Sequence, residues 1–151
     1  MNLTPMLSIT LFAMLNFLFG CGEDKKIKDD KFAVGQVWHY ETREGEEESV
    51  LTIVKLDQAD SLGPIIHVHI QGLKIKSPTA PSGFSDVIHH IPFSKDALMK
   101  SVTEKVGQVE QLPDFMEGYE QWHEAFIAGN GGVFATPVKE AIAYVEQGLN
   151  Q

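Results

Sequence analysis

The stretch IIHVHIQGLKIK, residues 65–76, decides how the fold of this chain is interpreted. Apolar and polar residues alternate along it, which is the period of a β-strand with one buried face. The apolar side chains hold the even positions of Ile66–Ile70 but the odd positions Leu73 and Ile75 after Gln71-Gly72. A one-residue bulge at Gln71-Gly72 keeps both sets on one face, so we predict a long strand in a bent antiparallel sheet.

Neighbouring segments complete a sheet of about four strands. Residues 34–42 (VGQVWHYET) and 49–57 have strand composition, and the acidic run 43–48 (REGEEE) between them is expected to be the solvated turn of a hairpin. Residues 85–93 (SDVIHHIPF) add a fourth strand. Pro92 lies at its end, where a missing backbone donor is tolerated.

The second half of the chain has helical periodicity. Ser94 can cap a helix in which Leu98, Val102 and Val106 recur at four-residue spacing. A third helix is expected after Thr136-Pro137. The helix between them carries an aromatic stripe that should pack on the sheet: Phe115, Tyr119, Trp122 and Phe126.

Strands first and helices last are typical of an α+β fold. We therefore predict a bent antiparallel sheet of about four strands, with about three helices packed on one face. No internal repeat is seen, and residues 32–151 are expected to form a single globular domain.

Histidines give one candidate site. His67 and His69 alternate along the central strand, so they share a face about 6 to 7 Å apart and can chelate one zinc or copper ion. A third ligand would come from His89 or His90, of which adjacency admits one, or from the first strand (His39 and Glu41). The competing interpretation is that His67 and His69 occupy the solvated face of the sheet and bind no cofactor.

Motifs for catalysis are missing from the sequence. There is no Gly-x-Ser-x-Gly elbow for a nucleophilic serine, and residues 129–132 (GNGG) are not followed by the Lys and Ser or Thr of a phosphate loop. The glutamates of residues 44–48 lack the spacing of a calcium loop. We expect no catalytic residue and favour a non-enzymatic role.

The N-terminus indicates where the protein works. The first twenty residues carry no charged side chain, and residues 6–19 (MLSITLFAMLNFLF) match the apolar core of a signal peptide. Leu18-Phe19-Gly20-Cys21 then resembles the lipobox of bacterial lipoproteins, in which the cysteine is lipidated by fatty-acyl chains such as palmitate. Cys21 is the sole cysteine, so lipidation leaves no free thiol in an exported protein.

This resemblance implies a signal peptide over residues 1–20 and a lipidated Cys21 that begins a charged tether over residues 21–31. Gly22 in second place implies the outer membrane, facing the periplasm, in a cell that has one. The other interpretation, an uncleaved anchor over the first twenty residues, also leaves the domain exported and tethered to a membrane.

Two blocks of the domain resemble those of a small bacterial domain family of unknown function. The first is Gly35–Trp38 with Tyr40, Thr42 and Arg43. The second is Gly118–Trp122 with Ala125-Phe126 and Gly132–Phe134. The resemblance implies a real fold and carries no activity.

The net charge of the chain limits the classes of partner that it can bind. The net charge is −9 and Arg43 is the sole arginine, which argues against nucleic acid and against an electrostatic hold on anionic lipid. We expect a membrane-tethered envelope lipoprotein that acts as a non-catalytic binding module, of which an immunity or inhibitor protein is one kind. Its partner would be an envelope protein, and the alternative is a His-based metal-binding envelope protein.

Overall fold

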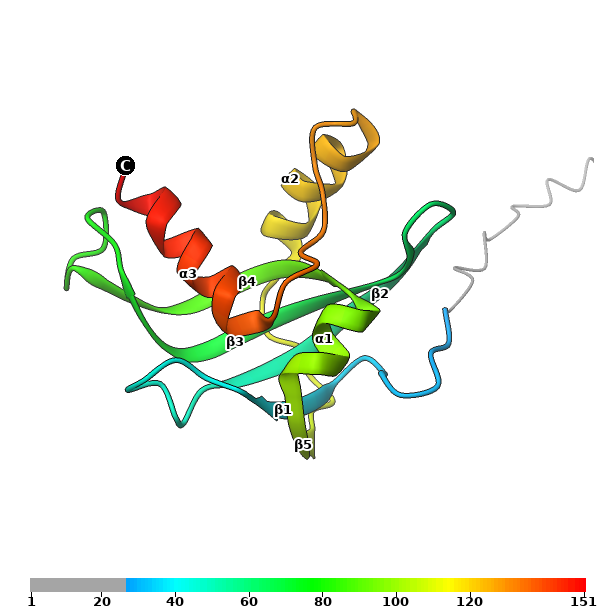
Figure 1. The fold of residues 1–151 in the computed structure, drawn as a ribbon, viewed down its shortest axis with the longest axis horizontal. Helices are drawn as coiled ribbons and strands as arrows, with labels where there is room; N and C mark the ends of the chain where they lie inside the picture. Colours follow the sequence, from blue (N-terminus) through cyan, green and yellow to red (C-terminus); the bar gives the residue numbers. More distant parts are fainter. Residues whose placement is uncertain (1–26) are drawn as a thin grey trace, which may run out of the picture.

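A computed structural model describes residues 27–151. The predicted signal peptide and the predicted lipidation site at Cys21 lie outside the described residues. The domain is built on five antiparallel strands in the order β4-β3-β2-β1-β5 (Figure 1). The strands are β1 (Gln36–Tyr40), β2 (Val50–Ala59), β3 (Gly63–Lys76), β4 (Phe84–Ser94) and β5 (Val102–Gln108).

Three helices accompany the sheet: α1 (Lys95–Ser101), α2 (Met116–Ile127) and α3 (Val138–Leu149). The predicted α+β class with an antiparallel sheet is confirmed, and the sheet has five strands rather than about four. Among residues 27–151, no helix is long and apolar enough to span a bilayer.

The bulge predicted in the central strand is present but is wider than the predicted single residue, because the four steps from Gln71 to Ile75 lie opposite the two steps from Val87 to Ser85. Gly72 has φ +80°, and the pairing of β3 with β4 shifts register between Gln71 and Ile75. Leu73 and Ile75 are therefore buried beside the earlier apolar positions of the strand, Ile66, Val68 and Ile70. Only glycine adopts this backbone without strain, so the chemistry of one residue determines how the sheet bends.

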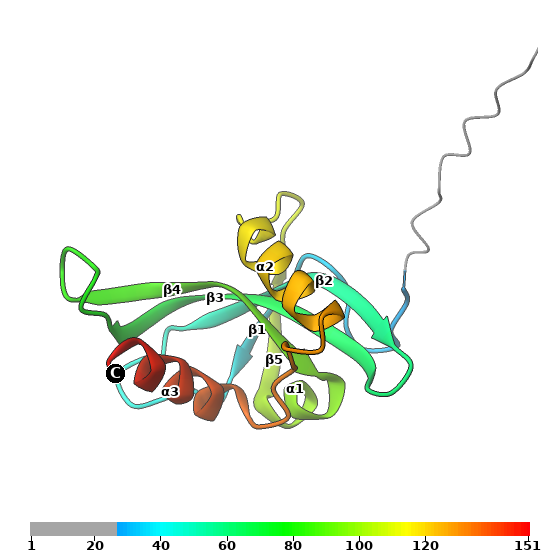
Figure 2. The same cartoon turned by 90° about the horizontal axis from the view of Figure 1, so that it is seen from above.

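The helices divide between the two faces of the sheet. The face that carries Ile66, Val68 and Ile70, here the core face, packs against α1 and α3 through Leu98 and Ile142. Helix α2 lies on the opposite face (Figure 2), here the α2 face. The prediction that the helices share one face thus holds for α1 and α3 and is wrong for α2.

Strand β5 (Val102–Gln108) is formed by a segment that the sequence pattern predicted to be helical. Ser94 caps α1 as expected, accepting a hydrogen bond from the Ala97 backbone N–H at 3.3 Å, but the helix ends at Ser101. Residues from Val102 onward pair with β1 instead. The four-residue apolar spacing fits a helix, yet Val106 is 44% exposed, and as a strand this segment pairs with the backbone groups at the edge of β1.

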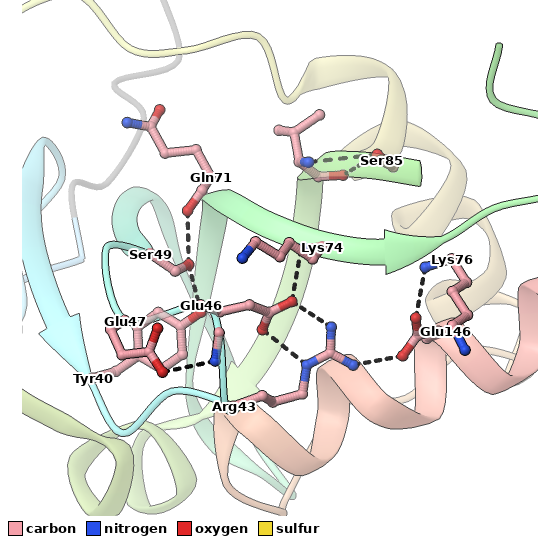
Figure 3. Close-up of polar contacts among 12 residues, drawn as sticks. Tyr40, Arg43, Glu46, Glu47, Ser49, Gln71, Lys74, Lys76, Ser85 and Glu146 are labelled. Carbon is pink, nitrogen blue, oxygen red and sulfur yellow. Dashed lines mark hydrogen bonds and ion pairs between the residues drawn. The ribbon is translucent and has the colours of Figure 1, made fainter. Parts of the chain in front are cut away.

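The acidic turn is not fully solvated as predicted. Glu46 is 3% exposed, and its carboxylate accepts hydrogen bonds from the Arg43 guanidinium and from the Lys74 backbone N–H (Figure 3). Arg43 also donates to Glu146 of α3 at 2.7 Å, and Glu146 accepts from the Lys76 backbone N–H. One arginine therefore ties the turn to α3 and, through its two carboxylate partners, to β3.

Candidate functional site

A cluster of polar and aromatic side chains fills the space between α2 and the sheet. Tyr119 and Trp122 point down from α2 onto His67, with ring centroids 5.2 and 4.7 Å from the imidazole. His67 is fully buried and His69 is 5% exposed. The competing interpretation, in which these histidines face solvent, is wrong, because the aromatic stripe of α2 covers their face of the sheet.

His67 bridges a carboxylate and a second histidine. Its Nδ1 atom is hydrogen-bonded to His90 Nε2 at 2.9 Å, and its Nε2 atom lies 3.1 Å from Asp57 Oδ2, without the alignment of a hydrogen bond. Tyr119 donates its hydroxyl proton to the same Asp57 oxygen at 2.9 Å. The contacts fit a neutral pair in which His90 Nε2–H donates to His67, whose own proton faces Asp57.

Burial keeps both imidazoles neutral. Loss of hydration lowers the pKa of His67 and of His90 to about 4, although the charge of Asp57 acts in the opposite direction. Burial and the neighbouring Asp57 carboxylate raise the pKa of Tyr119 above its usual range. At neutral pH the imidazoles of His67 and His90 are therefore uncharged.

Both adjacent histidines of β4 reach this face, which corrects the prediction that at most one could. Val68 pairs with Ile91 and Ile70 pairs with Ile88, so two residues of β4 lie opposite one residue of β3. This bulge turns both rings toward the α2 face. The His90 ring stacks on His67, and the His89 ring meets His69 edge to face, with centroids 5.1 and 5.6 Å apart.

The two proposed metal ligands, His67 and His69, each have another hydrogen-bonding partner. The His67 ring is engaged by His90 and Asp57, whereas His69 Nδ1 donates to the His89 carbonyl at 3.3 Å. The other proposed ligands lie on β1, two strands away from β3, where Glu41 beside its end accepts from Lys139. Within residues 27–151, no group of three or more His, Cys, Asp or Glu side chains is placed to hold a metal ion.

A groove of about 690 Å³ opens beside the cluster. Its walls come from the N-terminal segment, from β2 and from the start of α2. Asp57 belongs to both the groove and the histidine cluster, and Lys55 Nζ lies 3.7 Å from its Oδ1 atom. The apolar lining consists of Ile27, Phe32, Ala33, Val34, Val54, Leu56, Phe115 and Met116.

The sequence pattern predicts neither the groove nor the contacts of Asp57 with Tyr119 and His67. Lys55 and Asp57 alternate on β2, which predicts that they share a face of the sheet but not which element packs on that face. What brings Tyr119 onto Asp57 is the position of α2, which nothing in the local pattern encodes. Chemically, Asp57 can bind a hydrogen-bond donor or a cationic group beside the apolar side chains of the groove.

No protein-family profile, curated protein or solved structure matches this chain.

Proposed function

We propose that the chain is a lipid-anchored protein of the bacterial cell envelope that binds a partner or ligand without catalysing a reaction. The observation that carries the proposal is the groove, because it combines an apolar lining with a few charged groups. Its volume of about 690 Å³ falls within the ~300–1,000 Å³ of small-molecule sites.

The side chains of the groove favour binding over catalysis. Its polar members are Lys28, Asp29, Lys55 and Asp57, and among the described residues no Ser, Thr, Cys or His lines it. Lys55 and Asp57 already pair with each other, and Asp57 also holds the Tyr119 hydroxyl. Groups held in this way present a fixed charge pattern, which suits recognition.

The lipid anchor would keep this groove near a membrane. Ile27 lies six positions after Cys21. Even when fully extended, that length of chain spans at most about 20 Å. In a cell with an outer membrane we expect the groove to work at its periplasmic surface.

Mass spectrometry of the chain purified from membranes tests the anchor. We expect an N-terminus at Cys21 that carries acyl chains, and a Cys21→Ala variant that stays unacylated and unprocessed. A wild-type chain with an unprocessed, unacylated N-terminus would refute the anchor and leave the binding groove to be tested by itself.

A pull-down from envelope extract tests the binding role, with the purified full chain as bait. We expect one stoichiometric ligand or protein that is lost when Val34→Asp places a charge at the groove rim. A protein captured equally by both baits would mean that binding occurs elsewhere on the surface.

A His-based metal-binding envelope protein is the alternative function. One observation favours it: four histidines of β3 and β4 share the α2 face instead of two. The nitrogens of His67 and His90 are 2.9 Å apart, however, while two ligands of tetrahedral zinc lie about 3.3 Å apart. Zinc or copper would have to separate the pair, and a rise in melting temperature that His67→Ala/His69→Ala abolishes would support this function.

A further inference from the structure

We propose that the groove binds a zwitterionic phospholipid, with an acyl chain along its apolar wall and the head group at Lys55 and Asp57. This inference rests on the proposed envelope function and names its ligand. The shape, the charge pattern and the position of the groove support it independently.

The apolar wall is open to the surface. Its half-buried or exposed members include Ile27, Val34, Leu56 and Met116. Val34 is 37% exposed and Met116 is 47% exposed at its rim. Large apolar side chains gathered around an open groove are typical of a surface that an apolar ligand covers.

On β2 the groove carries one positive and one negative group, Lys55 and Asp57, in addition to Lys28 and Asp29 of the N-terminal segment. Tyr119 holds Oδ2 of Asp57, while Oδ1 lies 3.7 Å from Lys55 Nζ. Lys55 Nζ is also 5.0 Å from the centre of the Tyr119 ring, which favours one position of its charge. An ammonium can therefore bind Asp57 while a phosphate binds Lys55, which is the pairing a zwitterionic head group offers.

The groove would lie close to membrane phospholipids, because it is next to the tether that leads to the proposed lipid anchor. Ile27 and Lys28 form part of its lining, at the end of the tether that leads back to Cys21. A net charge of −9 opposes adsorption to an anionic surface, so a lipid without net charge suits this domain better than an acidic one.

Photo-crosslinking of the full chain in its membrane tests the inference. The photoreactive residue p-benzoylphenylalanine replaces Val34 at the groove rim or, as a matched control, Ile127, an apolar residue at the far end of α2 that is 70% exposed. After irradiation, intact-mass spectrometry is expected to find an adduct with the mass of a zwitterionic phospholipid at position 34. The yield at position 127 should be at least fivefold lower.

The head-group contacts are tested in the same assay. Lys55→Met/Asp57→Asn removes both charges, keeps side chains of similar size, and should lower the phospholipid adduct at position 34 about tenfold. Because Asp57 also holds Tyr119, Lys55→Met is examined alone. It leaves the hydrogen bond from Tyr119 to Asp57 in place and should still lower the yield at least threefold.

Several outcomes would overturn the inference. They are an adduct with another protein, an anionic-lipid adduct, a crosslink within the chain to its own acyl group, no adduct, or equal adducts at both positions. An unacylated Cys21 with a lipid adduct would refute the anchor and keep the ligand. An acylated Cys21 without a lipid adduct would refute the ligand and keep the anchor.

Discussion

The buried histidine pair should make this domain sensitive to mild acid. In the unfolded chain a histidine has a pKa of about 6.5, whereas burial lowers the pKa of His67 and His90 to about 4. As the pH falls below about 6.5, the unfolded state binds protons that the folded state refuses, so the free energy of unfolding decreases. This loss begins near pH 6.5 and levels off near pH 4.

The magnitude follows from the two pKa values. Between pH 7 and pH 5, one such histidine lowers the free energy of unfolding by about 2 kcal/mol. Two of them set an upper bound of about 4 kcal/mol, which is a large part of the ~5–15 kcal/mol available to a typical domain. Above pH 7 both states are neutral at these positions and the stability should be level.

Urea unfolding at pH 7 and pH 5 measures this loss, with His90→Gln as the diagnostic variant. The glutamine amide can still donate to His67 Nδ1, but it does not titrate. Because His90 is only partly buried and solvent screens part of its shift, we expect the variant to lose about 1 kcal/mol less than the wild type between the two pH values. His123→Gln, which changes an exposed histidine of α2, is the matched control and should behave as the wild type. Equal losses in the wild type and His90→Gln would refute the reasoning.

Three further changes test the packing of the fold by urea denaturation at pH 7. Arg43→Met leaves Glu46 buried without its cation and should lower the free energy of unfolding by about 3–5 kcal/mol. The double variant Arg43→Met/Glu46→Leu should regain most of this loss. A loss below 1 kcal/mol in the single variant would contradict the buried pair. Gly72→Ala should cost about 1–3 kcal/mol, because φ is +80° and the added Cβ would lie 3.1 Å from a backbone atom; an unchanged midpoint would exclude strain there. Ser101→Ala removes the hydroxyl that accepts from the Val138 N–H and should cost about 1–3 kcal/mol, whereas Ser101→Thr should retain most of the stability.

Local sequence patterns predicted what depends on neighbouring residues alone. The bulge at Gly72 was readable because the apolar phase changes there, and a change of phase must be absorbed by the backbone if one face is buried. The cap at Ser94 followed from side-chain chemistry that acts within one turn. Each of these features leaves its signature within a few residues.

The features that were missed depend on distant partners. Glu46 belongs to a run of glutamates whose composition predicts a solvated turn, and its burial follows from Arg43 together with the backbone of β3. The segment after Ser101 has a pattern compatible with both helix and strand, and the free edge of β1 decides between them. Pairing partners of this kind are invisible to periodicity, which considers one segment at a time.

The candidate site was the least predictable part because it is assembled at a discontinuity of the sheet. A regular strand would have turned His89 and His90 to opposite faces, and the bulge between Ile88 and Ile91 overrides that rule. The consequence is that His90 reaches His67, which in turn meets Asp57 of the groove lining. None of the side chains of α2 is fully buried, so its attachment depends on Tyr119, Trp122 and Phe126 at half-buried contacts. The same hydroxyl of Tyr119 holds Asp57 in place, and therefore the seating of α2, the neutrality of the histidine pair and the charge pattern of the groove are one physical system.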